Sequence, residues 1–391
     1  RIADLEARIA AGDFAKREKT EHDLVERNKR LQFELEKTKE RFHRYALEAE
    51  FQNRTPIGKI FGETGAGINF ARAIMTSLDL SAILRQGGKI SFGHPLRALK
   101  AVPGSLKAFV SEDADFRIRQ EIESRPNAPL YKKFGLELTS IGGDALSRTE
   151  EAYASRWVDK LPTAAGGGLI RGSGRSYTAF LNRLRADSFD AMLAALARDG
   201  SNPTKEEGRA IANYINVATG RGKVGKNEKS GEVLNTVFFA PRLVASRFQL
   251  LAGQPLYGGS NRTRKMIAME YARFLIGASV AIGLAMLMRD EDDETKPIEL
   301  DPRSANFGKV RFGDTFLDPL AGLAQVTVFL ARVASGETRT TTKDELKPLR
   351  DAYRLTDIAP GLGDGYELGK TGYGGRDVPD VIASFLRSRW A

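Results

Sequence analysis

The chain contains no cysteine and only three histidines, His22, His43 and His94, among its 391 residues. Without cysteine there are no disulfides and no thiolate metal sites. The spacing of the histidines does not suggest a zinc or histidine-based catalytic site, so no metal and no cofactor are expected. The first residues lack the pattern of a secretory signal, and a start at Arg1 suggests a piece of a longer chain.

Charge is unevenly distributed along the sequence. The formal net charge is +10, with 60 Lys and Arg against 50 Asp and Glu. Residues 201–288 hold 12 of the basic side chains and only 5 of the acidic ones, which gives this stretch a net charge of +7. A basic field of this kind favours nucleic acid or anionic lipid as a neighbour, although plain solubility explains it as well.

Residues 2–50 lack proline, and from Leu24 onward they show a heptad pattern. Apolar or small side chains recur at alternating spacings of four and three, and the residues expected to pack are Leu24, Asn28, Leu31, Leu35, Phe42 and Tyr45. A period of 3.5 with charged flanks predicts a coiled coil that brings copies of the chain together, with Asn28 setting the register. The alternative is a single amphipathic helix packed on its own body.

The remaining sequence predicts a mainly α fold, a multi-helix body with one small β-hairpin. Helical spacing of apolar residues marks residues 69–86, 95–110, 173–198, 204–219, 232–252, 319–334 and 378–389. We expect Gly87 and Gly88 to end the first of these helices, Pro103 to interrupt the second and Ser173 to cap the third. Alternation around Val310 and Phe312 predicts the hairpin within residues 307–317.

Composition and breaks suggest four regions. Residues 1–53 form the charged helix, and residues 54–170 form a helical subdomain with loops rich in glycine and proline. Residues 171–296 form a basic helical core that includes an apolar helix over 266–288, and residues 297–391 hold the hairpin and the last helices.

One stretch has the spacing of a phosphate-binding loop. Gly220 to Lys226 reads GRGKVGK, but Asn227 follows where Ser or Thr is needed to bind Mg²⁺. The residues before it resemble the end of a helix rather than a buried strand, which a phosphate loop requires. We therefore expect a basic loop that touches phosphate without sequence preference, and no catalytic residues.

Arginines lie near aromatic residues through the basic region. Such a mixture suits contacts with phosphates and bases, and equally suits arginines whose stems pack along ordinary helices. The candidate nucleic-acid contacts are Arg171, Arg175, Arg183, Arg185, Arg221, Lys223, Lys226, Arg242 and Arg247.

Residues 274–288 form a run of 15 residues without charge. A helix of that length spans about 22 Å, short of the roughly 30 Å hydrocarbon core of a bilayer. The sequence favours a fully buried core helix, with a membrane helix as the alternative, and in either case its apolar surface includes Phe274, Leu275, Ile276, Val280, Ile282, Leu284 and Leu287.

Several phrases occur in an order that resembles a known region. They are SLDLSAILRQG at 77–87, YTAFLNRLRAD at 177–187, INVATGRG at 215–222, NTVFFAPRLVASR at 235–247 and LDPLAGL at 317–323. Together they resemble the C-terminal region of the very large polyvalent proteins of tailed phages and prophages, which are often internal virion or DNA-ejection proteins. The resemblance covers roughly residues 70–390, and it supplies no catalytic motif.

The resemblance implies a structural, oligomeric protein located in the capsid interior or tail, and at the host envelope on infection. Its expected partners are further copies of itself, other virion proteins, DNA and the bacterial membrane. One alternative is a non-catalytic DNA-associated module of a giant phage polypeptide. Another is a hydrolase or NTPase whose site the sequence does not disclose.

Overall fold

The structure is a computed structural model of the whole chain. It describes residues 81–139, 167–199, 201–223, 241–287, 297–312, 315–340 and 345–348, and separate positions between Arg27 and Asn53. The contacts divide the chain into two units, residues 1–62 and residues 63–391. The described residues are mostly helical with two small antiparallel strand pairs, which confirms the predicted mainly α class.

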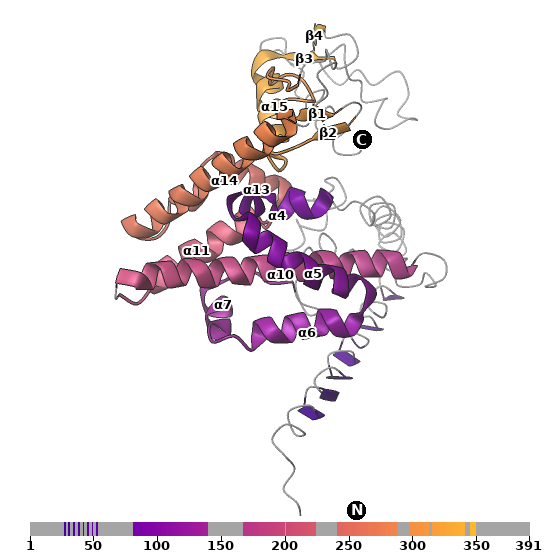
Figure 1. Cartoon of the computed structure of the whole chain (residues 1–391), viewed down its shortest axis with the longest axis vertical. Helices are drawn as coiled ribbons and strands as arrows, with labels where there is room; N and C mark the ends of the chain where they lie inside the picture. Colours follow the sequence, from indigo (N-terminus) through magenta and orange to yellow (C-terminus); the bar gives the residue numbers. More distant parts are fainter. Residues whose placement is uncertain are drawn as a thin grey trace, which may run out of the picture. The chain divides into compact units, whose positions relative to one another are not determined.

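Helices account for most of the described part of the second unit (Figure 1). In chain order they are α4 (Ser81–Gly93), α5 (Pro95–Val110), α6 (Glu112–Glu123), α7 (Ala128–Phe134), α10 (Gly167–Leu196), α11 (Lys205–Ala218), α13 (Pro241–Leu251), α14 (Asn261–Leu287) and α15 (Leu323–Ser335). Two short 3-10 helices, η2 (Ala197–Asp199) and η3 (Gln254–Leu256), join them.

The long helix α10 is the centre of the packing. Helices α5, α6, α11 and α4 all pack against it, and Figure 1 shows α5 and α6 lying along its length. Leu181, Leu184 and Phe189 on α10 are fully buried. Since α10 is apolar on several sides, it can be covered by neighbours around most of its circumference.

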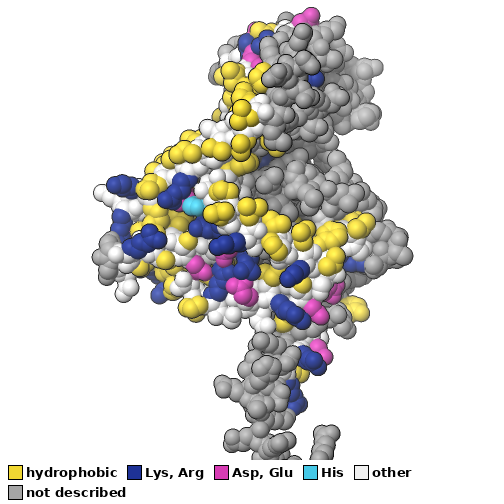
Figure 2. Space-filling model, viewed as in Figure 1, with side chains coloured by type: hydrophobic (Ala, Val, Ile, Leu, Met, Phe, Trp, Pro, Cys, Tyr) yellow, Lys and Arg dark blue, Asp and Glu magenta, His cyan; other side chains and the backbone are white. Residues whose placement is uncertain are grey.

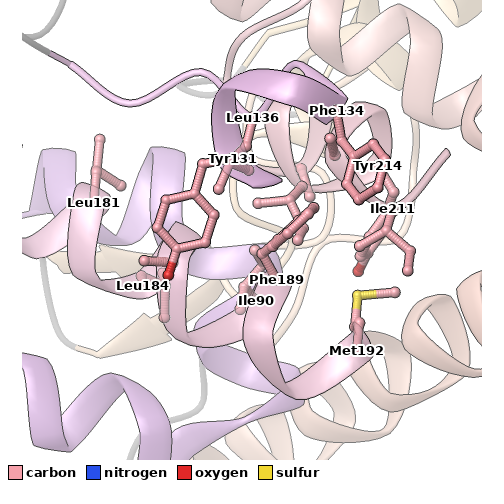
Figure 3. Packing of buried hydrophobic residues seen from close by; sticks show 14 of the residues in the cluster. Ile90, Tyr131, Phe134, Leu136, Leu181, Leu184, Phe189, Met192, Ile211 and Tyr214 are labelled. Atoms are coloured by element: carbon pink, nitrogen blue, oxygen red, sulfur yellow. The ribbon is translucent and has the colours of Figure 1, made fainter. Parts of the chain in front are cut away.

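The main core forms where α7, α10 and α11 meet (Figure 3). The ring of Tyr131 packs edge-on against Phe189, with centroids 5.5 Å apart, and Phe134 lies beside the same ring. Gly208 on α11 faces Phe134 so closely that a Cβ there would lie 2.5 Å from the ring. The absence of a side chain at Gly208 therefore sets the approach of α11 to α7.

The start of α11 confirms the helix predicted over residues 204–219. Thr204 accepts a hydrogen bond from the backbone N–H of Glu207, and the Glu207 side chain accepts one from the backbone N–H of Thr204. This reciprocal capping satisfies two N–H groups that a helix start otherwise leaves unpaired.

Three predictions about where helices end, break or begin are wrong. Close packing explains the first, which placed a helix end at Gly87 and Gly88. Helix α4 continues through Gly87 and Gly88, where Cβ atoms would lie 3.0 Å from the Phe180 ring and 2.8 Å from the Ala321 Cβ. The two glycines therefore permit close contact within a helix instead of ending it. Helix α10 begins before Ser173, and α5 runs through Pro103, which is exposed.

The predicted hairpin is present as β1 (Val310–Phe312) paired antiparallel with β2 (Thr315–Leu317). Its register places Val310 opposite Leu317, and Val310 is fully buried. A second antiparallel pair, β3 (Glu337–Arg339) with β4 (Leu346–Pro348), was not predicted, because three-residue strands leave little alternation in a sequence. The helix predicted over residues 378–389 lies outside the described residues.

Candidate functional site

The first pair of candidate arginines lies along α10 and is held by neighbouring helices. Arg175 donates to the backbone oxygens of Ala108 and Phe109 at the end of α5, which helix geometry leaves without a partner within the helix. Arg183 forms an ion pair with Glu121 on α6, with N and O atoms 3.1 Å apart. Both side chains therefore tie α10 to its neighbours.

Arg185 and Arg221 are buried in a polar cluster between α10 and the end of α11. Arg185 donates to the hydroxyl and the backbone oxygen of Thr219, and Arg221 donates to the Thr139 hydroxyl at 2.6 Å. Glu137 lies 3.5 Å from Arg221. Their guanidinium groups are used inside the protein and are not offered to a phosphate in this conformation.

Arg242 and Arg247 on α13 are also buried. Arg242 pairs with Glu137, and Arg247 donates to Gln325 on α15 at 2.8 Å. Gly322 makes room for Arg247, because a Cβ at that position would lie 2.1 Å from the guanidinium. Arg242 and Arg247 therefore tie α13 to its neighbours, as Arg175, Arg183 and Arg185 tie α10 to its own.

The glycines of the phosphate-loop-like stretch serve backbone packing. Gly220 has a φ of +86°, which only glycine adopts readily, and a Cβ at Gly222 would lie 2.2 Å from the backbone nitrogen of Ser246. Lys223 is exposed and Arg171 is half-buried, whereas Lys226 lies outside the described residues. The structure does not bring the eight described candidates together into one exposed basic surface, because most of them are buried or half-buried.

Helix α14 holds the apolar run and is anchored through its first half. Ile267 is fully buried in the main core, and Arg262 at the helix start forms an ion pair with buried Glu207 at 2.7 Å. The hydrogen bonds from Arg262 hold the pKa of the Glu207 carboxyl well below its usual range.

Glu270 adds a second anchor. Its carboxylate accepts a hydrogen bond from the ring of His94, which directly precedes α5, and pairs with Arg273 one turn along α14. Burial alone would raise the pKa of Glu270, but His94 and Arg273 outweigh it, and the net shift is downward. The start of α5 is thus held beside the first half of α14.

Midway along α14, Gly277 allows the closest contact with α4. A Cβ there would lie 1.9 Å from the backbone oxygen of Phe92. Phe274 and Ala278 are buried on the same side, so the helix rests on α4 through a strip of small or well-packed residues.

The opposite side of residues 275–287 is exposed and carries no charge. Leu287 is 83% exposed, and the other large exposed side chains of this half are Leu275, Ile276, Val280, Leu284 and Met286. Figure 2 shows hydrophobic side chains gathered along this helix. The expectation of a fully buried core helix is therefore wrong, because the body covers only one side of it.

Length and composition would also allow α14 to cross a membrane. It has 27 residues, and only 22% of its apolar window is buried inside the protein. A helix of that length is about 40 Å long, more than the roughly 30 Å of a hydrocarbon core. Among the candidate residues of this run, Phe274 is the buried one, and Ile282 is half-buried.

A second exposed apolar surface lies on α5 and was not singled out from the sequence. We call it the α5 stripe, and its residues are Leu96, Leu99, Val102, Pro103, Leu106 and Val110. Figure 2 shows hydrophobic side chains over both α5 and α14 on the face in view. The apolar spacing predicted the helix, but spacing alone does not tell which apolar face is left uncovered.

The heptad residues of the first unit are exposed wherever the structure describes them. Leu31 and Leu35 are just over half exposed, Phe42 and Tyr45 are 74% exposed, and Asn28 is exposed as well. Leu24 lies outside the described residues. The described heptad positions are helical, and the predicted pairing of copies through them stays a prediction.

Within the described ranges, no three His, Asp or Glu side chains lie close enough to hold a metal ion. No family model matches this chain, and neither does any curated protein or solved structure.

Proposed function

We propose that the chain is a non-enzymatic structural protein of a tailed phage, and that it contacts the lipid bilayer of the host envelope through α14 during DNA delivery. One observation carries the membrane contact in this proposal: residues 275–287 expose a wide helical surface without a single charged side chain. Soluble proteins rarely expose large contiguous apolar patches unless these contact a partner or a membrane.

The energetic argument rests on the size of the exposed side chains. Moving a large apolar side chain from water into an apolar phase is worth roughly 1.5–3 kcal/mol, and a half-exposed one about half of that. Six such side chains on residues 275–287 therefore favour association with lipid by several kcal/mol, which is enough for reversible membrane binding.

The charges along α14 suit a helix that lies in the membrane interface. Arg264, Lys265 and Arg273 are exposed on the first half, where they can approach lipid phosphates, and the second half is apolar. A helix lying in the interface need not carry the acidic residues 290–294 across the bilayer. The first half also stays anchored through Ile267.

The other parts of the proposal come from the sequence. The heptad seam would join copies of the chain, and other virion proteins would be its neighbours in the capsid or tail. The net charge of +10 would favour proximity to packaged DNA. The resemblance to internal virion and ejection proteins gives these features a common setting.

Flotation with liposomes tests the proposal. We expect wild-type protein to float with anionic liposomes, and the double variant Val280→Asp/Leu284→Asp to lose flotation by tenfold or more, because about 2–4 kcal/mol is lost for each carboxylate moved toward lipid. Both positions are more than half exposed, so the variant should keep its fold, which circular dichroism checks.

Leu300→Asp is the matched control, since the Leu300 side chain is 71% exposed but lies outside α14 and α5. Wild type that stays at the bottom of the gradient would exclude the membrane role. In that case a DNA-associated module becomes the better account, and DNA binding that weakens steeply with salt would support it. The net charge of +10 is the observation in its favour.

A further inference from the structure

We propose that the α5 stripe is a second lipid-contacting surface, specific for anionic lipid, and that it lies flat on the bilayer beside α14. This inference rests on the proposed function, because it assumes that the same face of the protein meets a membrane. It assigns a lipid preference to a helix for which neither the sequence nor the resemblance suggested a role.

The spacing of the α5 stripe makes it continuous. Leu96, Leu99, Pro103, Leu106 and Val110 recur every three or four positions, and Val102 lies next to Pro103. The stripe therefore follows one side of a helix of 16 residues, about 24 Å long. Leu96 is 74% and Val110 is 78% exposed, so the stripe is open at both ends. The opposite side, with Ala101, Ser105 and Ala108, is buried.

The charge next to the stripe selects the kind of partner. Lys100 and Lys107 are exposed, and because they are one heptad apart they lie along the same border of the stripe. Helix α5 contains no Asp or Glu. An apolar face bordered only by lysines is the pattern of a helix that lies on an anionic membrane.

A second copy of α5 complements this surface poorly. It would offer no carboxylate to Lys100 or Lys107. Pro103 also lies within the stripe, where its ring interrupts the regular side-chain interlocking of paired helices. A fluid lipid surface has no such requirement.

The position of α5 supports simultaneous contact. His94 joins the start of α5 to Glu270 of α14, and Figure 2 shows apolar side chains over both helices on one face. The proposed lipid-contacting surface of α5 ends after Val110, because α6 begins with the acidic residues Glu112 and Asp113.

Partitioning onto vesicles tests the inference with two α5 variants. The vesicles are phosphatidylcholine alone, or phosphatidylcholine with about one third phosphatidylserine. We expect Lys100→Gln/Lys107→Gln to lose binding by roughly 10–30-fold on the anionic vesicles and to bind neutral vesicles as wild type does. Leu99→Asp/Leu106→Asp should lose binding on both.

The control for charge is Lys132→Gln/Lys133→Gln, which removes two exposed lysines from α7. Equal losses in this control and in the α5 lysine variant would overturn the inference. The inference would also be overturned if the α5 variants bind vesicles like wild type. If such variants change the oligomeric mass instead, the α5 stripe is a contact between protein chains.

The two proposals fail in different ways. If Val280→Asp/Leu284→Asp abolishes vesicle binding while both α5 variants bind like wild type, the α5 inference is wrong and the membrane role of α14 stands. If wild type binds neither type of vesicle, the proposed function itself is wrong.

Discussion

At the scale of single residues, buried cations explain why the number of arginines in a region is a poor guide to how many of them face solvent. Arg185 and Arg247 are fully buried; Arg185 donates to the hydroxyl of Thr219, and Arg247 donates to the side-chain oxygen of Gln325. A buried guanidinium that forms several hydrogen bonds acts as a clamp between helices. Part of the basic excess is therefore structural.

Lys89 on α4 is a buried cation whose pKa is strongly lowered. Its ammonium group points toward the backbone oxygen of Ala321 at 3.5 Å, with Arg247 and Asp318 as its charged neighbours. Burial and, after it, Arg247 lower the pKa of Lys89 from 10.5 to about 7, and Asp318 offsets this only in part.

This pKa makes folding depend on pH. Between pH 7 and 10.5 the unfolded chain binds a proton at Lys89 that the folded chain does not, so stability rises with pH across this window. We expect Lys89→Met to raise the free energy of unfolding by roughly 2–4 kcal/mol at pH 6, since each pKa unit corresponds to about 1.4 kcal/mol and part of the shift relaxes.

Chemical denaturation at pH 6 and pH 10 measures the effect. The advantage of Lys89→Met should shrink toward zero at the higher pH, where Lys89 is neutral in the folded state and the cost of its burial has largely gone. Lys132→Met on α7 is the control, since Lys132 is exposed, and its effect should not vary with pH. An equal gain at both pH values would show that packing and not ionisation governs Lys89.

At the scale of elements, glycines within helices decide how closely the helices approach. Gly277→Ala should destabilise the protein by about 1–3 kcal/mol, because its Cβ would lie 1.9 Å from the backbone oxygen of Phe92 and would push α14 away from α4. Urea denaturation checks the prediction.

Gly283→Ala is the matched control on the same helix. Apart from the neighbouring backbone of α14 itself, no atom lies within 4 Å of the place that a Cβ at Gly283 would take. Alanine there should stabilise the helix by up to about 1 kcal/mol through its better helix propensity. If both variants behave alike, α14 is not seated on α4 as the structure shows.

Local signals predicted much of the secondary structure. The capping pattern of Thr204 and Glu207 and the alternation around Val310 each depend on neighbours in sequence, and both elements formed where predicted. The prediction that Gly87 and Gly88 end a helix was wrong because the role of these two glycines depends on residues that are not neighbours in sequence. Their role depends on Phe180 and Ala321, which are distant in sequence, and a stop signal cannot be told from a packing site without those neighbours.

The candidate sites show the same limit. The sequence identified the apolar run of α14 and the arginines of the basic region, but not which sides of them would be covered. Arg175 and Arg183 are held by α5 and α6, while Leu284 is left exposed. Coverage is a property of tertiary packing, which residue spacing does not contain.

At the scale of the whole molecule, self-association would multiply weak membrane contacts. Once one copy is bound, further contacts made by joined copies become intramolecular, and their effective concentration raises the overall affinity without any new contact. The α14 surface and the α5 stripe would then be repeated in every copy of an assembly. The heptad seam of residues 24–49 is the part of the chain that we expect to provide the joining.

The double variant Leu31→Asp/Leu35→Asp tests this role of the seam. Both leucines are just over half exposed in the single chain, so the variant should fold normally but lose self-association by at least about 100-fold, since carboxylates cannot be buried between helices without partners. Sedimentation across a range of protein concentrations measures the change. Arg30→Asp is the control, because Arg30 falls outside the seam, next to Leu31.

Vesicle binding of the same variants connects the seam to the membrane. If assembly supplies the multivalency, Leu31→Asp/Leu35→Asp should bind anionic vesicles at least tenfold more weakly than wild type, with α14 and the α5 stripe unchanged. A variant that sediments as a smaller species and still binds vesicles like wild type would mean that one copy suffices for the membrane contact. A variant whose mass does not change would mean that the heptad pattern marks an amphipathic helix and not a site of self-association.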